Sequence, residues 1–306
     1  MNAAGKLSAY GVALALVAGG GWGLGTAVGP LAGTTGARGA EDAGHGDSHS
    51  GTVAGTAQPD QPAGLASSRG GYTLTPTDTT LAAGTTTPFS FRITGPTGQP
   101  MTQFEVEHDK RMHLIVVRRD TAGYQHVHPE MAPDGTWTVP LEVTRPGSYR
   151  AFADFTPTGG EPTTLGVDLA VAGDFQPVAY APSRIADIDG YQVRLGGDLV
   201  TGTSTVTLTV TRDGREVTDL QPYLGAYGHL VALRAGDLAY LHVHPDGAPG
   251  DGRTRPGPTV TFHAEVPSAG TYRLFLDFQH EGQVRTAEFT VPAVTPGTGD
   301  SHGAHG

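Results

Sequence analysis

The chain has 306 residues, a formal net charge of −11 and no cysteine, and it contains 46 glycines and 23 prolines. The absence of cysteine excludes disulfides, thiolate zinc sites and blue-copper centres, and the acidic balance without a dense basic stretch argues against a nucleic-acid partner. The many turn-forming residues favour short strands over helices, and the length allows two domains with flanking segments.

The N-terminal part of the chain is expected to be an export element. No charged residue occurs between Lys6 and Arg38, and the run contains an apolar core. Residues 1–33 therefore predict either a cleaved signal peptide or an uncleaved anchor in the cytoplasmic membrane, with the rest of the chain outside it. Residues 34–70 are rich in Gly, Ala, Ser and Thr without periodicity, and they predict a disordered linker that contains histidines.

From Tyr72 onward the sequence predicts two β-sandwiches. Short runs of β-branched and aromatic residues alternate with turn signals, and after a linker at 174–190 the same order restarts. Such spacing is typical of antiparallel sandwiches, and the P-G-S-Y and A-G-T-Y steps resemble the start of an immunoglobulin strand F. The predicted fold is all-β, with tandem Ig-like sandwiches (cupredoxin-like or copper-carrier-like) at 71–173 and 191–293 and a disordered histidine-containing tail at 294–306.

The repeat is strongest in one stretch. HLIVVRRDTAGYQHVHP begins at His113, and HLVALRAGDLAYLHVHP begins at His229, 116 residues later. Both copies place a histidine thirteen residues before an H-x-H pair, which predicts a hairpin with histidines at both ends. Beyond this hairpin the second copy has a longer loop, so the offset becomes 123 and Asp154 corresponds to Asp277.

These hairpins predict metal sites. Alternate residues of a strand share a face, so each H-x-H pair is expected to converge with the first histidine of its hairpin. Three convergent imidazoles suit Cu(II) or Zn(II), and one aspartate per copy is a candidate fourth ligand. The sequence leaves open whether the copies share one site or hold one each. The candidate metal ligands are His113, His126, His128 and Asp154 in the first copy and His229, His242, His244 and Asp277 in the second.

Several polar residues are expected to be structural or exposed. Tyr149 and Tyr272, at the two predicted starts of strand F, are expected to point inward. Asp154 and Asp277 have the opposite strand parity, which places them on an outer sheet face where a carboxylate needs no ligand role. His108, His263 and His280 each occur in one copy only and are expected at the surface.

The second copy, VTDLQPYLGAYGHLVALRAGDLAYLHVHP, resembles exported actinobacterial proteins that often accompany heavy-metal P-type ATPases. The resemblance covers mainly residues 174–292. It implies copper or heavy-metal handling outside the cytoplasmic membrane, with a metal-transporting ATPase or another envelope metal protein as partner. More loosely, the chain is similar to periplasmic copper-resistance carriers, whose Cu(II) sites use His and Asp. The ligand that those carriers have at the mature N-terminus is not visible in this sequence.

The sequence therefore favours a non-enzymatic, extracytoplasmic protein that buffers or delivers Cu(II) or Zn(II). The alternative is an Ig-like interaction or adhesion module of the cell envelope whose histidines hydrogen-bond their neighbours. A copper enzyme of the superoxide dismutase type is disfavoured, because each copy supplies too few histidines and no catalytic arginine is recognisable.

Overall fold

A computed structural model describes residues 61–241 and 243–296. These residues form strands and turns, and none of them belongs to a helix that is long and apolar enough to cross a membrane. The predicted leader at 1–33 lies outside the described residues, as do most of the predicted linker and most of the predicted tail.

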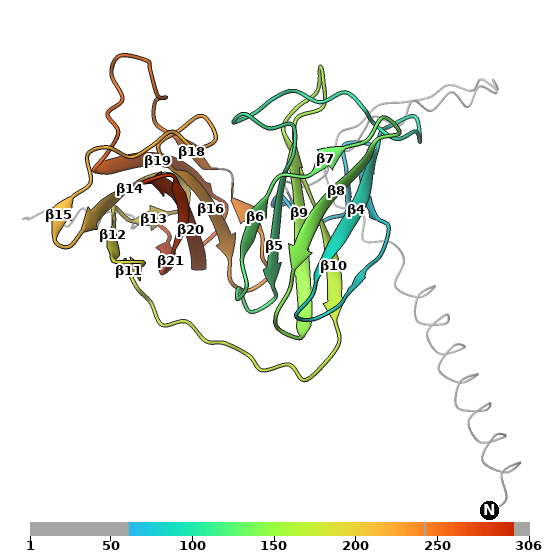
Figure 1. Ribbon diagram of the computed structural model, residues 1–306, viewed down its shortest axis with the longest axis horizontal. Coiled ribbons are helices and arrows are strands. Elements are labelled where there is room, and N and C mark those ends of the chain that lie inside the picture. Colours follow the sequence, from blue (N-terminus) through green and yellow to red (C-terminus); the bar gives the residue numbers. More distant parts are fainter. Residues whose placement is uncertain (1–60, 242, 297–306) are drawn as a thin grey trace, which may run out of the picture. The chain divides into compact units, whose positions relative to one another are not determined.

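The first copy folds as a sandwich of two five-stranded sheets, called here sandwich 1 (Figure 1). From one edge to the other, its first sheet consists of β1 (Ser68–Arg69), β2 (Tyr72–Pro76), β4 (Thr86–Thr94), β8 (Thr136–Glu142) and β7 (Glu130–Met131). Its second sheet consists of β3 (Thr80–Leu81), β10 (Thr163–Val171), β9 (Gly147–Phe155), β5 (His113–Arg118) and β6 (Gln125–Val127).

The second copy, sandwich 2, repeats this order. Its first sheet consists of β11 (Ile185–Ile188), β12 (Tyr191–Gly196), β14 (Gly202–Arg212), β19 (Thr259–Val266) and β18 (Val243–Pro245), with β15 (Arg215–Glu216) paired to β14. Its second sheet consists of β13 (Leu199–Val200), β21 (Gln283–Val294), β20 (Gly270–His280), β16 (His229–Arg234) and β17 (Tyr240–Leu241).

Both sandwiches have the strand order of immunoglobulin domains. In sandwich 1, β2-β4-β8-β7 correspond to strands A-B-E-D, and β10-β9-β5-β6 correspond to G-F-C-C′. Each sandwich also has a tyrosine corner at the start of strand F. The Tyr149 hydroxyl donates to the carbonyl of Arg145 at 2.8 Å, and the Tyr272 hydroxyl donates to that of Ser268 at 2.8 Å. The prediction of two Ig-like sandwiches is confirmed.

Strands β5 and β16 are buried on both faces. They begin with His113 and His229, the first histidines of the two hairpins. Leu114 and Val116 pack into the core of sandwich 1, whereas Ile115 and Val117 of the same strand pack against sandwich 2. We call the apolar cluster between the sandwiches the junction. It consists of Ile115, Val117, Phe152, Val231, Leu233, Leu238, Tyr240 and Phe275, with Ala63 and Tyr124 packed against it.

The junction joins equivalent positions of the two copies. Ile115 corresponds to Val231, Val117 to Leu233 and Phe152 to Phe275. Each copy therefore contributes the same patch to the contact, as in a two-fold interface. The outer sheet faces expected from the sequence are in this way removed from water.

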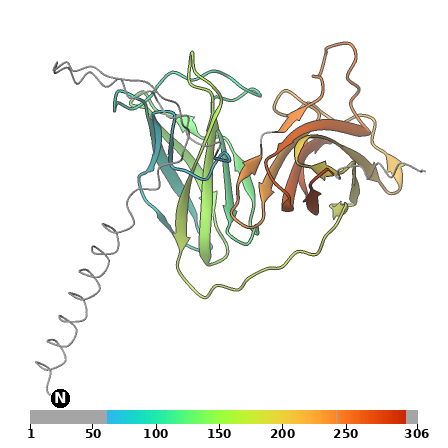
Figure 2. The same cartoon turned by 180° about the vertical axis from the view of Figure 1, so that it is seen from behind.

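The domain boundaries differ from the predicted ones. Residues 61–70 were expected in the disordered linker, yet Ser68–Arg69 form β1 and the backbone N–H of Tyr240 donates to the carbonyl of Ala63 at 3.0 Å. The linker expected at 174–190 contains β11, which pairs with β12. Its earlier part connects the sandwiches as an extended segment (Figure 2). The sequence of these segments resembles that of turns, so their ordered structure could not be recognised from it. They are ordered by contacts with residues that are distant in the sequence.

Candidate metal centre

Strand register brings the histidines of sandwich 1 to the junction. His126 of β6 lies directly opposite Ile115 of β5, so its side chain is on the junction face, and His113 is two residues before Ile115 on that same face. The ring centroids of His113 and His126 are 5.3 Å apart. The His128 ring centroid lies 4.8 Å from that of His126 and 5.0 Å from that of His113. The predicted convergence of these three rings is what the structure contains.

His229 of sandwich 2 joins this group from the other side of the junction. Its ring stacks on that of His126 at 4.9 Å and on that of His113 at 5.4 Å between centroids. One nitrogen each of His113, His126 and His229 lies within 4.8 Å of the others, which is close enough for one metal ion to reach all three. The sequence had placed His229 with His242 and His244 in its own copy.

The hydrogen bonds of His113 and His126 leave one lone pair on each ring, and the two lone pairs face each other. His113 Nε2 lies 3.0 Å from the carbonyl of Glu107, so this nitrogen carries the proton. His126 Nδ1 lies 2.8 Å from the Asp277 carboxylate and likewise carries a proton. The remaining nitrogens, His113 Nδ1 and His126 Nε2, are 3.1 Å apart. Such a contact needs a positive centre between the nitrogens, either a proton that makes His126 an imidazolium or a metal ion.

Two further ring nitrogens at the cluster are buried and have no hydrogen-bond partner among the described residues. They are Nδ1 of His229 and Nε2 of His128. A buried polar atom without a partner costs about 1–3 kcal/mol, so such atoms are uncommon away from functional sites. Both can act as metal ligands, and together with the facing pair they give four imidazoles in one place.

Burial keeps most of these rings neutral. Desolvation, followed by the charge of His126, lowers the pKa of His113 to about 4 and that of His128 to about 3. The same two causes hold the pKa of His229 well below its usual value. Because only the neutral imidazole has a lone pair for a metal, these three rings are competent ligands at neutral pH.

The two candidate aspartates play different roles. Each is the cross-strand partner of the first histidine in its copy, Asp154 of His113 and Asp277 of His229. Asp277 binds His126 of the other sandwich and accepts a second hydrogen bond, from Thr286, at 2.6 Å. Asp154 accepts the hydroxyl of Thr164 at 2.7 Å. Asp277 thus orients a ring from outside the nitrogen group, which is the usual role of a carboxylate behind a metal-bound histidine.

Of the second H-x-H pair, the structure describes one residue. His242 lies outside the described residues. His244 is exposed on β18, opposite His263 of β19, and β18 belongs to the sheet that does not contain β16. The hairpin of the second copy therefore crosses from one sheet to the other between β17 and β18, which the matching sequences did not indicate.

Of the three histidines expected at the surface, only His263 is exposed. His280 is 8% exposed, and its Nδ1 lies 2.6 Å from the Tyr191 hydroxyl, so the expectation is wrong for this residue. His108 is half-buried, and its ring centroid lies 5.2 Å from that of His229. The only sequence feature that distinguished His108 was its position in the turn just before β5. The second copy has no histidine at this position.

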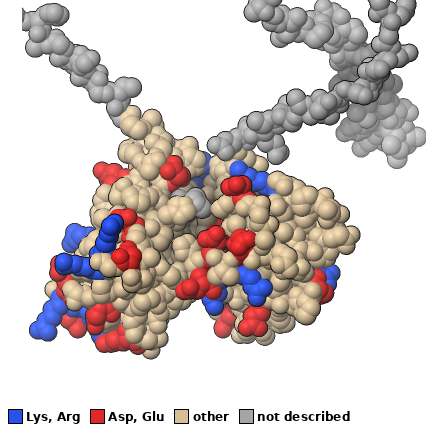
Figure 3. Space-filling model, turned by 90° about the horizontal axis from the view of Figure 1, so that it is seen from above, with Lys and Arg blue, Asp and Glu red and all other residues tan. Residues whose placement is uncertain are grey.

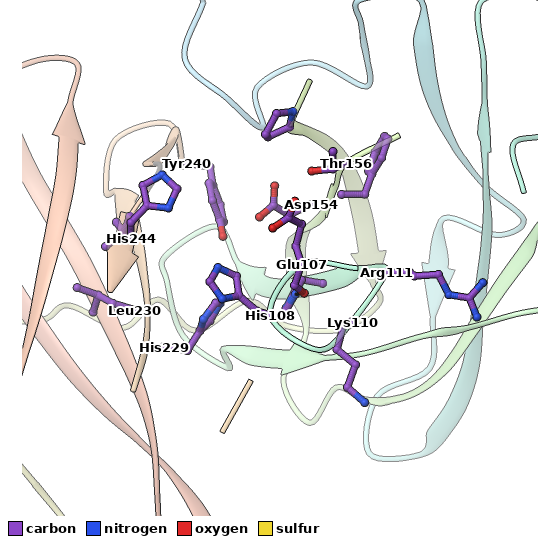
Figure 4. A pocket seen from close by; sticks show the side chains of 14 residues that line it. Glu107, His108, Lys110, Arg111, Asp154, Thr156, His229, Leu230, Tyr240 and His244 are labelled. Carbon is purple, nitrogen blue, oxygen red and sulfur yellow. Dashed lines mark hydrogen bonds between the residues drawn. The ribbon is translucent and has the colours of Figure 1, made fainter. Parts of the chain in front are cut away.

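A pocket of about 230 Å³ opens beside the cluster and receives residues from both sandwiches. Figure 4 shows His108 beside His229 in this pocket, with Tyr240 and His244 also on its wall. Carboxylates of Glu107 and Asp154 line it together with the side chain of Lys110. Two rings of the cluster, those of His113 and His229, also line this pocket.

A family model described as a domain of unknown function (DUF8832) matches the chain twice, at residues 66–173 and 186–295. The two matches coincide with the two sandwiches. No curated protein matches the chain.

Solved structures with some similarity include surface proteins of bacteria. FdeC, an Escherichia coli adhesin, is 13% identical with a TM-score of 0.24, over 74% of this chain and 65% of that chain. Invasin, a bacterial integrin-binding protein, is 13% identical with a TM-score of 0.22, over 73% and 40%. A putative membrane anchored protein from Corynebacterium diphtheriae is 11% identical with a TM-score of 0.23, over 73% and 57%. The chain spans less than two thirds of each of these structures, and similarity at this level assigns no activity.

Proposed function

The chain belongs to the DUF8832 family, with one family domain in each sandwich, and from the histidines at the junction we propose that the two domains together bind one divalent metal ion. The ion lies at the junction, held by His113 and His126 of sandwich 1 and by His229 of sandwich 2. His128 is the nearest candidate for a fourth ligand.

The facing nitrogens of His113 and His126 are the observation that carries this proposal. Two nitrogens bound to one ion at about 2.0–2.1 Å each lie roughly 3 Å apart, which is the spacing found here. The protons on the far side of each ring are held by Glu107 and Asp277. An acceptor behind each ring fixes its tautomer and its orientation, as the second sphere of metal sites does.

The ligand chemistry points to Cu(II) or Zn(II). All candidate ligands are imidazole nitrogens, and the chain has no cysteine to favour a softer ion. Cu(II) binds a given nitrogen site more tightly than Zn(II), so Cu(II) is the expected ion wherever both are present. The function proposed for this site is binding and delivery of the ion without catalysis.

The place of action follows from the N-terminal sequence. The uncharged run after Lys6 is an export signal or a membrane anchor, so residues 34–306 act outside the cytoplasmic membrane. Figure 3 shows acidic and basic side chains intermixed on one face of the molecule, without the dense positive surface that a nucleic acid requires. The partner that fits is a protein that gives or takes the ion, such as a metal-transporting ATPase in the same membrane.

A second candidate function is an Ig-like interaction module of the cell envelope with structural histidines. The hydrogen bond of His126 to Asp277 and the apolar junction favour it, since both hold the sandwiches together without an ion. FdeC and invasin are named as an adhesin and an integrin-binding protein.

Elemental analysis separates the two functions. The full chain is purified without a polyhistidine tag, exposed to Cu(II) or Zn(II) and desalted. To leave only the sandwich histidines, serines replace the four histidines outside the sandwiches, which are His45, His49, His302 and His305. We expect one equivalent of metal, lost in His229→Gln and kept in His263→Gln, whose ring is exposed. If the protein holds no stoichiometric metal after this treatment, the metal-binding function is contradicted and the interaction module takes its place.

A further inference from the structure

The turn that precedes β5 brings one more imidazole to the metal centre. Glu107 and Lys110 exchange backbone hydrogen bonds of 2.8 and 3.0 Å, with His108 and Asp109 at the tip. The carbonyl of Glu107 also accepts the proton of His113. The turn is thus fastened to a proposed ligand, and its tip lies over the cluster.

The second copy has the same turn with a different side chain. Tyr223 and Ala226 exchange backbone hydrogen bonds of 2.8 and 3.2 Å, and Leu224 takes the position of His108. Both residues have a left-handed backbone, with φ of 48° at His108 and 54° at Leu224. Left-handed backbone is unfavourable for both residue types, so the fold and not the side chain sets this conformation. The imidazole of His108 is therefore an addition that the turn itself does not need.

His108 lines the pocket together with His113 and His229, which are more deeply buried. It is half-buried, and its ring centroid lies 5.2 Å from that of His229 and 6.1 Å from that of His113. His113 is only 4% exposed and His229 only 9%. Of the three rings, His108 is therefore the one most accessible to an ion in the pocket.

We propose that His108 and His229 form an outer metal position, through which a divalent ion passes between the pocket and the inner ligands. The inference rests on the metal site proposed above and adds a route to it. At the outer position two waters of the ion give way in turn to His108 and His229. On the way to the inner position the ion keeps His229, while His113 replaces a further water and His126 then replaces His108. Each step replaces one ligand at a time, so the ion never loses its whole coordination shell at once.

A ligand that serves only during passage alters rates and leaves the equilibrium unchanged. The variant His108→Leu tests this, because the second copy shows that the turn accepts leucine. Loading is followed with Zn(II) alone, and release is followed by transfer of Zn(II) to an excess of chromophoric chelator. We expect both rates to fall by about tenfold or more while the Kd stays the same. Lys110→Arg is the matched control, since it alters the same turn and the same pocket while keeping the charge and every imidazole, and its rates should equal those of the wild type.

Three results would contradict the inference. If His108→Leu loads and releases Zn(II) at the wild-type rates, the outer position is contradicted but the inner site is not. A large loss of affinity in this variant would overturn it as well, because His108 would then be a permanent ligand. If the wild-type chain binds no Zn(II), the proposed metal site is itself contradicted, and the outer position is contradicted with it.

Discussion

His126 of the first sandwich and Asp277 of the second form a buried hydrogen bond of 2.8 Å, with side chains that are 2% and 4% exposed. The bond links residues 151 positions apart in the sequence. It fixes the proton of His126 on Nδ1 and turns Nε2 towards His113. A contact that holds the two domains together therefore also orients a ring nitrogen of the proposed metal site.

Asp277→Asn should weaken metal binding about 10- to 100-fold, the usual cost of losing an acceptor behind a metal-bound histidine. Isothermal titration with Zn(II) measures the change. Asp154→Asn is the matched control, because Asp154 is the equivalent residue of sandwich 1 but accepts the hydroxyl of Thr164. An equal loss in both variants would show that the His126 contact has no special role.

Acid should destabilise the metal-free protein. The pKa of His113 is lowered to about 4 and that of His128 to about 3, whereas an unfolded histidine titrates near 6.5. The unfolded state therefore binds more protons than the folded state below pH 6.5, and the free energy of unfolding falls as the pH drops towards 4. The contribution of His113 is on the order of 3 kcal/mol, at 1.36 kcal/mol per pH unit.

Urea unfolding at pH 7.5 and pH 4.5 measures this dependence. Carboxylates also titrate in part of this range, so the comparison is between the wild type and two variants. His113→Gln should lose part of the dependence, and His263→Gln, altered at an exposed ring, should keep it. Equal pH dependence in all three proteins would contradict the neutral, buried state of His113.

Phe275→Ala should destabilise the protein by about 3–5 kcal/mol, the range for a fully buried phenylalanine. Phe275 is 0% exposed and stacks on Tyr124 of the other sandwich at 4.0 Å between ring centroids. Phe175→Ala, at a residue that is 47% exposed, is the control and should change the stability little. Denaturant titration of both variants measures the difference. A cost for Phe275→Ala as small as that of the control would mean that the junction contributes nothing to stability.

Much of the fold could be predicted from the sequence, because it depends on local patterns and on the repeat. Strand alternation, turn residues and the constant offset gave two sandwiches of one topology. They also paired Asp154 with Asp277, and each proved to be the cross-strand partner of a hairpin histidine. Tyr149 and Tyr272 were expected to point inward, and both form tyrosine corners.

The cluster of rings from both sandwiches could not be predicted, because it depends on how the two sandwiches meet. Strand parity put Asp277 on an outer face, and only the packing of the copies turned that face into an interior. A signal was present in HLIVVR and HLVALR, which are apolar at nearly every position where a half-exposed strand would alternate. Such runs indicate strands that are buried on both faces. His108 had no signal of this kind, since a turn histidine acquires its neighbours only through tertiary contacts.

The most direct test of a shared site is a crystal of the metal-loaded protein measured at the absorption edge of copper or zinc. The anomalous map should show one peak per chain at the junction, bonded to His113 Nδ1, His126 Nε2 and a nitrogen of His229 at about 2.0–2.1 Å. Separate peaks within each sandwich, or no peak among these three rings, would contradict a single site built from both domains.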